Sequence, residues 1–120
     1  MKFYIKTGNV FPPLKARLLQ HNNEPIQLTS FDTVKFYMSA KNNRSNLIID
    51  GAPVQIIYDE QYVNHGFVEY QWEFHDTAVS GLYQGEFRII LDDGKEFNVP
   101  NNGYIDIIID HSLKEEEGED

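Results

Sequence analysis

Apolar residues fall on every second position through most of this chain, and this period of two constrains its fold more than any other feature. In residues 33–39, for example, Val34, Phe36 and Met38 alternate with their neighbours. Such alternation places one side of an extended strand in a core and the other side in water. No stretch of ten or more residues carries a clean stripe of helical period, so the sequence predicts an all-β chain. The expected strands are residues 14–18, 33–39, 67–74, 83–91 and 105–110, with shorter ones at residues 3–6, 47–50, 54–58 and 96–99.

Turn-forming residues separate these segments at fairly regular intervals. Asn22–Pro25 and Asn42–Asn46 flank the strand expected over 33–39, and Asp50-Gly51 and Asp92–Lys95 supply residues that tolerate positive φ in tight hairpins. Short strands at roughly ten-residue spacing favour a sandwich or a barrel. The chain has 120 residues and neither a repeat nor an internal linker. We therefore expect one β-sandwich domain over residues 1–113 and an acidic, disordered tail over residues 114–120.

One local motif narrows the class of sandwich. Gly81-Leu82-Tyr83 opens the long alternating strand over residues 83–91. A Gly-x-Tyr in this position resembles the tyrosine corner of immunoglobulin-like domains, whose hydroxyl group bonds to the backbone upstream. We interpret Tyr83 as this corner, and Trp72 and Phe87 as core residues. The sequence thus predicts an immunoglobulin-like antiparallel β-sandwich of about seven to nine strands.

The charge balance limits the partners that the chain can bind. Nineteen acidic residues against ten basic ones give a net charge of −9, of which the tail over residues 114–120 contributes five acids and one base. A phosphate backbone or an anionic membrane surface needs clustered Lys and Arg, so neither nucleic acid nor membrane is an expected partner. No apolar run approaches the roughly 20 residues of a membrane span. We interpret the tail as a solvated end, with a docking role as the alternative.

The residue types that carry catalysis or hold metals show no convincing pattern. The four histidines (His21, His65, His75 and His111) lack the close spacing of metal ligands, and the chain has no cysteine. His75-Asp76 resembles an imidazole oriented by a carboxylate, but no nucleophile motif accompanies it, so we interpret Asp76 as a turn cap. Asp92, Asp93 and Glu96 resemble a calcium loop only loosely, and a hairpin turn explains them better. The sequence predicts no enzyme, no cofactor and no metal site.

Four apolar residues fall on positions that the alternation directs outward, namely Leu19, Tyr37, Ile90 and Ile108. Isolated exposed apolar residues are ordinary on protein surfaces. If several of them share one sheet face, however, they form a patch suited to a protein partner. We advance this docking surface as a hypothesis, with scattered exposure as its alternative.

Several segments together resemble a known family. They are residues 12–19, 24–29, 33–38, 66–72, 76–77, 81–87 and 93–105. In order, they are similar to the small immunoglobulin-like modules of tailed-phage baseplate proteins, above all to the amino-terminal module of baseplate upper proteins. The resemblance covers roughly Val10 to Ile109. It implies a non-enzymatic structural or adaptor component of a phage tail tip, made in the host cytoplasm, located in the virion and docked on other baseplate proteins.

Two other functions are compatible with the sequence. A carbohydrate-binding module of the same sandwich class would recognise host cell-wall sugars on exposed aromatic platforms. Its candidate platforms are Tyr4, Tyr37, Tyr62, Phe67 and Tyr104. The other alternative is a cytosolic adaptor without a phage connection.

Overall fold

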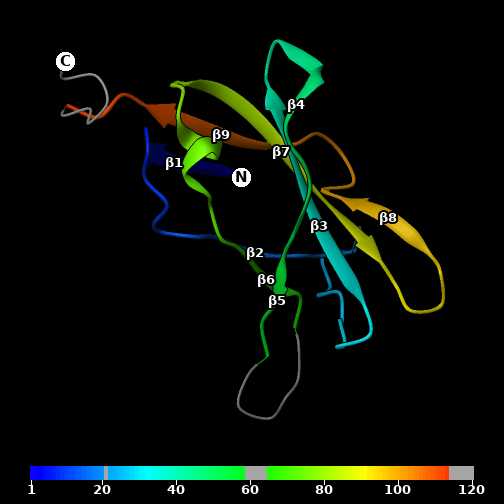
Figure 1. Ribbon diagram of the computed structural model, residues 1–120. Coiled ribbons are helices and arrows are strands. Elements are labelled where there is room, and N and C mark those ends of the chain that lie inside the picture. The colour runs from blue at the N-terminus through cyan, green and yellow to red at the C-terminus, as the bar shows by residue number, and fades with distance from the viewer. Residues whose placement is uncertain (21, 59–64, 114–120) are drawn as a thin grey trace.

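The structure is a computed structural model that describes residues 1–20, 22–58 and 65–113. The predictions that concern His21, Tyr62 and the tail over residues 114–120 fall outside these residues. Over the described part, the chain forms nine strands and one short 3-10 helix (Figure 1). The elements are β1 (Lys2–Lys6), β2 (Leu14–Arg17), β3 (Thr33–Ala40), β4 (Asn43–Pro53), β5 (Gln55–Ile56), β6 (Phe67–Tyr70), η1 (Phe74–Thr77), β7 (Gly81–Ile90), β8 (Glu96–Val99) and β9 (Ile105–Asp110).

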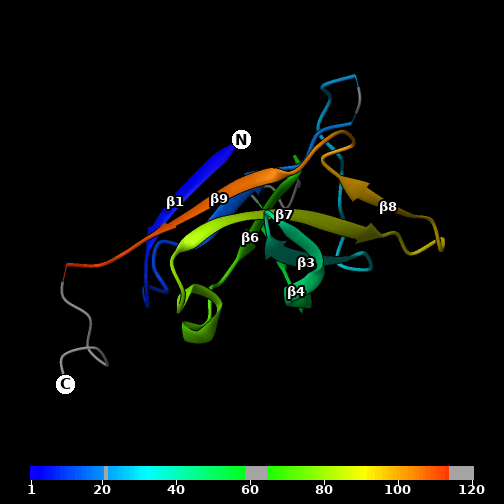
Figure 2. The same ribbon diagram turned by 90° about the horizontal axis from the view of Figure 1, so that it is seen from above.

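The strands form two sheets packed as an immunoglobulin-like β-sandwich. One sheet has six strands in the order β1-β9-β7-β3-β4, with β8 also paired to β7, and the other has three in the order β2-β6-β5. All pairs are antiparallel except β1 with β9, which run parallel and join the two ends of the domain. Figure 2 shows β1, β9 and β7 side by side in one layer. The prediction of an all-β immunoglobulin-like sandwich of about seven to nine strands is confirmed, with this one parallel pair as a departure from an antiparallel sandwich.

Strand β7 is the centre of the six-stranded sheet. Along one edge it pairs with β3 over Tyr83–Ile90, and along the other it pairs first with β9 over Gly81–Gly85 and then with β8 over Phe87–Ile90. The change of partner follows from the break between β8 and β9, where Pro100 lacks an amide hydrogen to donate to a sheet. As a result, β7 has two halves with different neighbours.

The core is an aromatic cluster between the inner faces of the two sheets. The ring of Phe36 on β3 lies 5.1 Å from that of Phe87, 4.9 Å from that of Tyr70 and 6.1 Å from that of Trp72, measured between centroids. Trp72 is 2% exposed and Phe87 is fully buried, as expected for the core positions assigned from the sequence. Burial of each such ring stabilises the fold by about 1.5–3 kcal/mol.

Tyr83 sits at the start of β7 with its ring in the core and 7% of its surface exposed. Its hydroxyl group donates a hydrogen bond of 2.7 Å to the carbonyl oxygen of Val79, four residues upstream. Burial raises the pKa of the Tyr83 hydroxyl above its ordinary value, so this group remains a donor over the physiological range. This is the geometry that the Gly-x-Tyr motif predicted. The hydrogen bond connects the segment between η1 and β7 to the start of β7.

Two expected turns lie inside a strand instead. Asp50-Gly51 does not close a hairpin, because both residues belong to β4, where a bulge opposite Phe36 and Tyr37 shifts the register. Gly51 has φ of +80° at this bulge. Residues 43–46 also belong to β4, although Asn42–Asn46 was expected as a turn. A bulge and a hairpin turn both need residues that tolerate positive φ, so the sequence signal does not separate them.

The segment after β6 also differs from the expected strand over residues 67–74. The strand ends at Tyr70, and Phe74–Thr77 form η1. Asp76 stabilises this turn because its carboxylate accepts a hydrogen bond of 2.8 Å from the backbone amide of Glu73. By contrast, the turn expected at Asp92–Lys95 closes the β7–β8 hairpin, with the Leu91 amide donating to the Lys95 carbonyl at 2.8 Å.

Candidate functional site

The contacts of the His75-Asp76 pair are those of a turn cap. The Asp76 side chain is 97% buried and accepts a hydrogen bond of 2.5 Å from the Tyr70 hydroxyl, in addition to the bond from the Glu73 amide. Burial raises the pKa of Tyr70 above its ordinary value, and the hydrogen bond to Asp76 raises it further. The hydroxyl therefore remains a donor. His75 lies in solvent, 71% exposed, with Nε2 3.4 Å from an Asp76 carboxylate oxygen. The carboxylate therefore serves as the turn cap that the sequence predicted.

The acidic residues around the β7–β8 hairpin also have local partners. Asp93 accepts a hydrogen bond of 3.0 Å from the backbone amide of Lys95 inside the turn. Glu96 forms an ion pair of 2.7 Å with Arg88. Across residues 1–20, 22–58 and 65–113, no three His, Cys, Asp or Glu side chains gather closely enough to hold a metal ion. No helix in this part of the chain is long and apolar enough to span a membrane.

The structure does not bring the four predicted docking residues together. Leu19 follows β2 and lines a hollow of about 510 Å³ with Ile26, Phe97 and Val99 at one end of the sandwich. Tyr37, Ile90 and Ile108 lie on the outer face of the six-stranded sheet, but not as neighbours. Ile108 is in register with Leu82, and Ile90 lies eight residues further along β7, roughly 26 Å away at the rise of a strand. The four residues therefore do not form one continuous patch, and their part in docking stays a prediction.

Ile108 instead belongs to a different set of apolar side chains. It is in register with Tyr4 on β1 and with Leu82 on β7, so the three residues form one row across three adjacent strands. Tyr4 is 60% exposed and Leu82 is 59% exposed, whereas the residues next to them in the chain, Ile5 and Tyr83, point into the core. We call Tyr4, Ile108 and Leu82 the apolar row. Large apolar groups left in water side by side mark a surface that gains free energy when it is covered.

Charged residues border the apolar row on both sides. Two residues before Tyr4 and Ile108, Lys2 of β1 is in register with Asp106 of β9, and we call this pair the first charged row. Two residues after them, Lys6 is in register with Asp110, and we call this pair the second charged row. Because side chains two apart in a strand share a face, both rows lie on the outer face with the apolar row between them.

The two charged rows differ in their contacts within the chain. In the first row, the Asp106 carboxylate lies 3.4 Å from the ammonium group of Lys41, which is 55% exposed. In the second row, neither Lys6 nor Asp110 forms a side-chain ion pair with any other residue that the structure describes. The second row therefore keeps both charges available to a partner.

Sequence reasoning found Ile108 but not the other two members of the row. The alternation around Tyr4 covers only the short segment over residues 3–6, so Tyr4 was considered only as a possible sugar platform. Leu82 was assigned to the Gly-x-Tyr motif, although its position between Gly81 and the inward Tyr83 already places it outside. The missing information was the register of β1, β9 and β7, because it joins Ile108 to Tyr4 across 104 positions and to Leu82 across 26.

In the described part of the chain, the aromatic residues considered as sugar platforms do not all gather at one place. Tyr37 and Tyr104 line one hollow on the outer face together with Gln84 and Glu86, but its volume is about 120 Å³. That is well below the roughly 300–1,000 Å³ of typical small-molecule pockets. Phe67 instead stacks against Arg17, whose guanidinium carbon lies 4.9 Å from the ring centroid. Phe67 therefore does not share an aromatic platform with Tyr37 and Tyr104.

Comparisons with known proteins correct the expected family. No family model matches the sequence, and no curated protein matches it. Among solved structures the chain is similar to CopC from Methylosinus trichosporium OB3b, at 12% identity and a TM-score of 0.47, over 96% of this chain and 89% of that one. This similar structure is not that of a baseplate protein. The assignment to tailed-phage baseplate modules, and with it the role as a virion tail component, is wrong. At this distance the likeness transfers no function from CopC.

The error has a physical origin. The segments that carried the resemblance are alternating strands, turn residues and a tyrosine corner, and these features specify how a sandwich folds. Sandwich domains without sequence similarity share them, so they say little about which partner a sandwich binds.

Proposed function

We propose that this chain is a non-enzymatic binding module that docks a protein partner on the outer face of the six-stranded sheet, at the apolar row. The observation that carries the proposal is the register of Tyr4, Ile108 and Leu82, which lines up three outward apolar side chains on adjacent strands. The charged rows on either side provide the polar rim that typically surrounds the centre of a protein interface.

The non-catalytic part of the proposal is supported by what the candidate catalytic groups contact. Asp76 caps η1 and holds the Tyr70 hydroxyl, Asp93 closes a turn, and Glu96 pairs with Arg88. Each group thus has a structural explanation.

Site-specific photo-cross-linking in the cells that make the chain tests the proposal. A photoreactive benzophenone amino acid in place of Tyr4 retains an aromatic side chain on the apolar row. We expect a discrete protein adduct from this position, and its loss when Leu82→Glu is added to the same chain. The matched control carries the same group in place of Phe31, which is 77% exposed in the loop before β3. Equal adducts from both positions, or none from position 4, would contradict the proposal.

A further inference from the structure

We infer that the partner is a second copy of this chain, docked face to face about a two-fold axis that runs along the strands between β1 and β9. The inference rests on the proposed function, because it identifies what covers the apolar row. A two-fold interface brings the same patch of both subunits together, so each patch must be complementary to itself. The outer face of β1 and β9 meets this requirement in the order of its charges.

The parallel register of β1 and β9 makes the face self-complementary. A two-fold axis between them places β1 of one copy over β9 of the other, with each position facing its register partner. Each lysine of the two charged rows then faces an aspartate of the second copy, and Tyr4 faces Ile108. Four Lys–Asp contacts would thus surround two Tyr–Ile contacts. Leu82, one strand further out, packs against the edge of the Tyr4 ring of the second copy.

The same charges disfavour the other symmetric arrangements. A two-fold axis across the strands places β1 over β1, so that Lys2 meets Lys6 and Asp106 meets Asp110. Antiparallel pairing of two β1 edges around Tyr4 also sets Lys2 opposite Lys6. Like charges placed opposite one another are destabilising, and lysines on an edge strand oppose edge-to-edge association. The charge pattern therefore selects one orientation.

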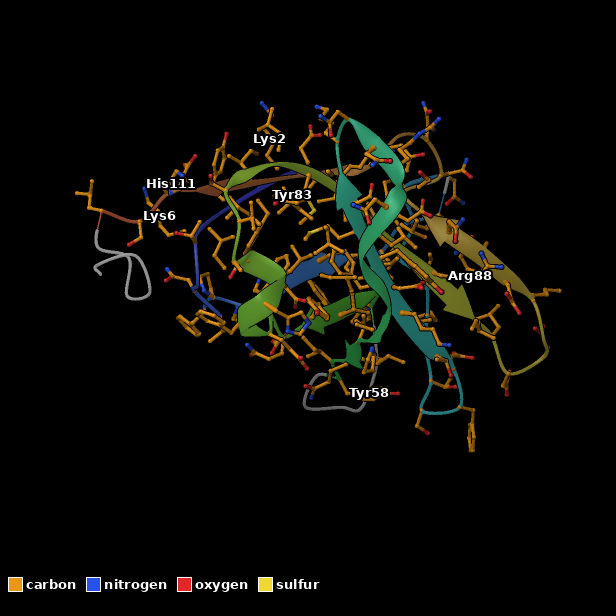
Figure 3. All side chains as sticks on the ribbon, turned by 45° about the horizontal axis from the view of Figure 1, so that its top comes forward. Lys2, Lys6, Tyr58, Tyr83, Arg88 and His111 are labelled. Atoms are coloured by element: carbon orange, nitrogen blue, oxygen red, sulfur yellow. The ribbon has the colours of Figure 1, made fainter. Side chains whose placement is uncertain are left out.

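The second charged row is the better place to test this orientation. Lys6 and Asp110 have no ion-pair partner among the described residues, whereas Asp106 is already near Lys41. Figure 3 shows Lys6 toward one end of the molecule and Arg88 toward the other, so changes at position 6 are remote from the Arg88–Glu96 pair. The face comprises few side chains compared with the 20–30 residues a side of a standard interface, so we expect association in the micromolar to millimolar range.

Charge exchange within the second row provides the experiment. Lys6→Glu alone, and Asp110→Lys alone, each place two like-charge contacts in a homodimer. We expect each to weaken self-association about tenfold in sedimentation equilibrium at low salt. An equimolar mixture of the two variants pairs opposite charges at both contacts, so association returns to within about threefold of the original. The chain that carries both substitutions also regains self-association, with the signs exchanged.

Further variants separate lost docking from lost folding. Leu82→Glu is expected to abolish self-association, whereas Phe31→Glu, a control at a more exposed position away from the face, leaves it unchanged. Circular dichroism and thermal unfolding establish that each variant is folded before it is scored.

Three results would overturn the second copy as partner. They are an unsubstituted chain that stays monomeric at millimolar concentration, single variants that associate as tightly as the original, and a mixture no tighter than its components. The cross-linking experiment then distinguishes the two levels of the argument. An adduct between position 4 and a different protein rejects the second copy but leaves the docking function, while the absence of any adduct rejects both.

Discussion

The two halves of β7 carry different outer surfaces on one continuous strand. In the half that pairs with β8, Arg88 donates hydrogen bonds of 3.0 and 2.7 Å to a carboxylate oxygen of Glu96 and one of 3.3 Å to the amide oxygen of Asn98. In the half that pairs with β9, the outer face presents Leu82 beside Ile108 and Tyr4, with charges of the second row unpaired among the described residues.

The outer surface beside β8 has its charges paired within the chain, whereas the outer surface beside β9 leaves apolar side chains exposed to water. Covering the Arg88–Glu96 pair with a partner would cost desolvation without supplying a new contact. Covering the apolar row removes apolar area from water, and the second charged row gains opposite charges. Both halves contribute residues to the same core, so the contrast lies in the outward side chains and in the strand that lies beside them.

The largest expected effect comes from the core position beneath the junction of the two halves. A Cβ atom at Gly85 would lie 2.7 and 2.9 Å from atoms of the Phe36 ring and 3.0 Å from Cδ1 of Ile107. Gly85→Ala should therefore lower the free energy of unfolding by about 1–3 kcal/mol, measured by urea denaturation. Since the ring lies under both halves, hydrogen exchange should accelerate in both.

A double variant tests that the clash with Phe36 is the cause. Phe36→Leu removes ring atoms and is destabilising on its own, but it makes room for the added methyl group. Gly85→Ala should then cost less in the Phe36→Leu background than in the original chain. Equal costs in the two backgrounds would show that the contact with the ring is not responsible.

The next effect concerns the half that pairs with β9. Tyr83→Phe removes the hydrogen bond to the Val79 carbonyl and keeps the ring, so we expect a loss of about 1 kcal/mol in the free energy of unfolding. Tyr104→Phe is the matched control, because its hydroxyl only contacts Arg44 at 3.4 Å and the residue is 41% exposed. Similar losses in both variants would argue against a special role of the corner.

A smaller effect is expected in the half that pairs with β8. Arg88→Ala removes a pair whose side chains are 39% and 43% exposed, so solvent screens most of its attraction. We expect a loss of about 0.5 kcal/mol in unfolding free energy, which shrinks as salt is added. Self-association should not change. A tenfold weaker association of this variant would mean that the docking face extends over both halves of β7.

The fold could be predicted from the sequence because its signals are local. Alternation in β3, β7 and β9 and the Gly-x-Tyr motif at Tyr83 each act within a few residues, and each is sufficient to orient a strand. The signals failed where two structures need the same residue type, as at Gly51, where a bulge takes the place of the expected turn.

The candidate site could be predicted only in part, because it depends on contacts between residues that are distant in the sequence. The direction of Ile108 follows from alternation, but its neighbours depend on which strands pair. The parallel pairing of β1 with β9 brings Tyr4 next to Ile108 across more than 100 residues, and no local pattern encodes that register. The predicted residues Tyr37 and Ile90 do lie on the same outer face, yet the length of β7 separates Ile90 from Ile108.

The smallest expected effect lies at the boundary between the two halves, at Glu86. Burial raises the pKa of the Glu86 carboxyl above its ordinary value, and Arg88 offsets only part of this rise. Because the folded pKa exceeds the unfolded one, the contribution of Glu86 to stability is fully present below the unfolded pKa and is lost as pH rises through the folded pKa. At neutral pH the ionised carboxylate is therefore held where the fold disfavours it.

Glu86→Gln should then raise the midpoint of thermal unfolding at pH 7 by about 1 °C, and the gain should disappear below pH ~4, where both side chains are neutral. Glu24→Gln, at an exposed position in the segment before β3, controls for the change in net charge. A gain at pH 7 that persists at pH 3 would assign the effect to packing instead of ionisation. A lower midpoint of thermal unfolding at pH 7 would mean that the attraction between Arg88 and the Glu86 carboxylate outweighs the cost of burial. Glu86 would then belong to the surface whose charges pair within the chain, together with Arg88 and Glu96.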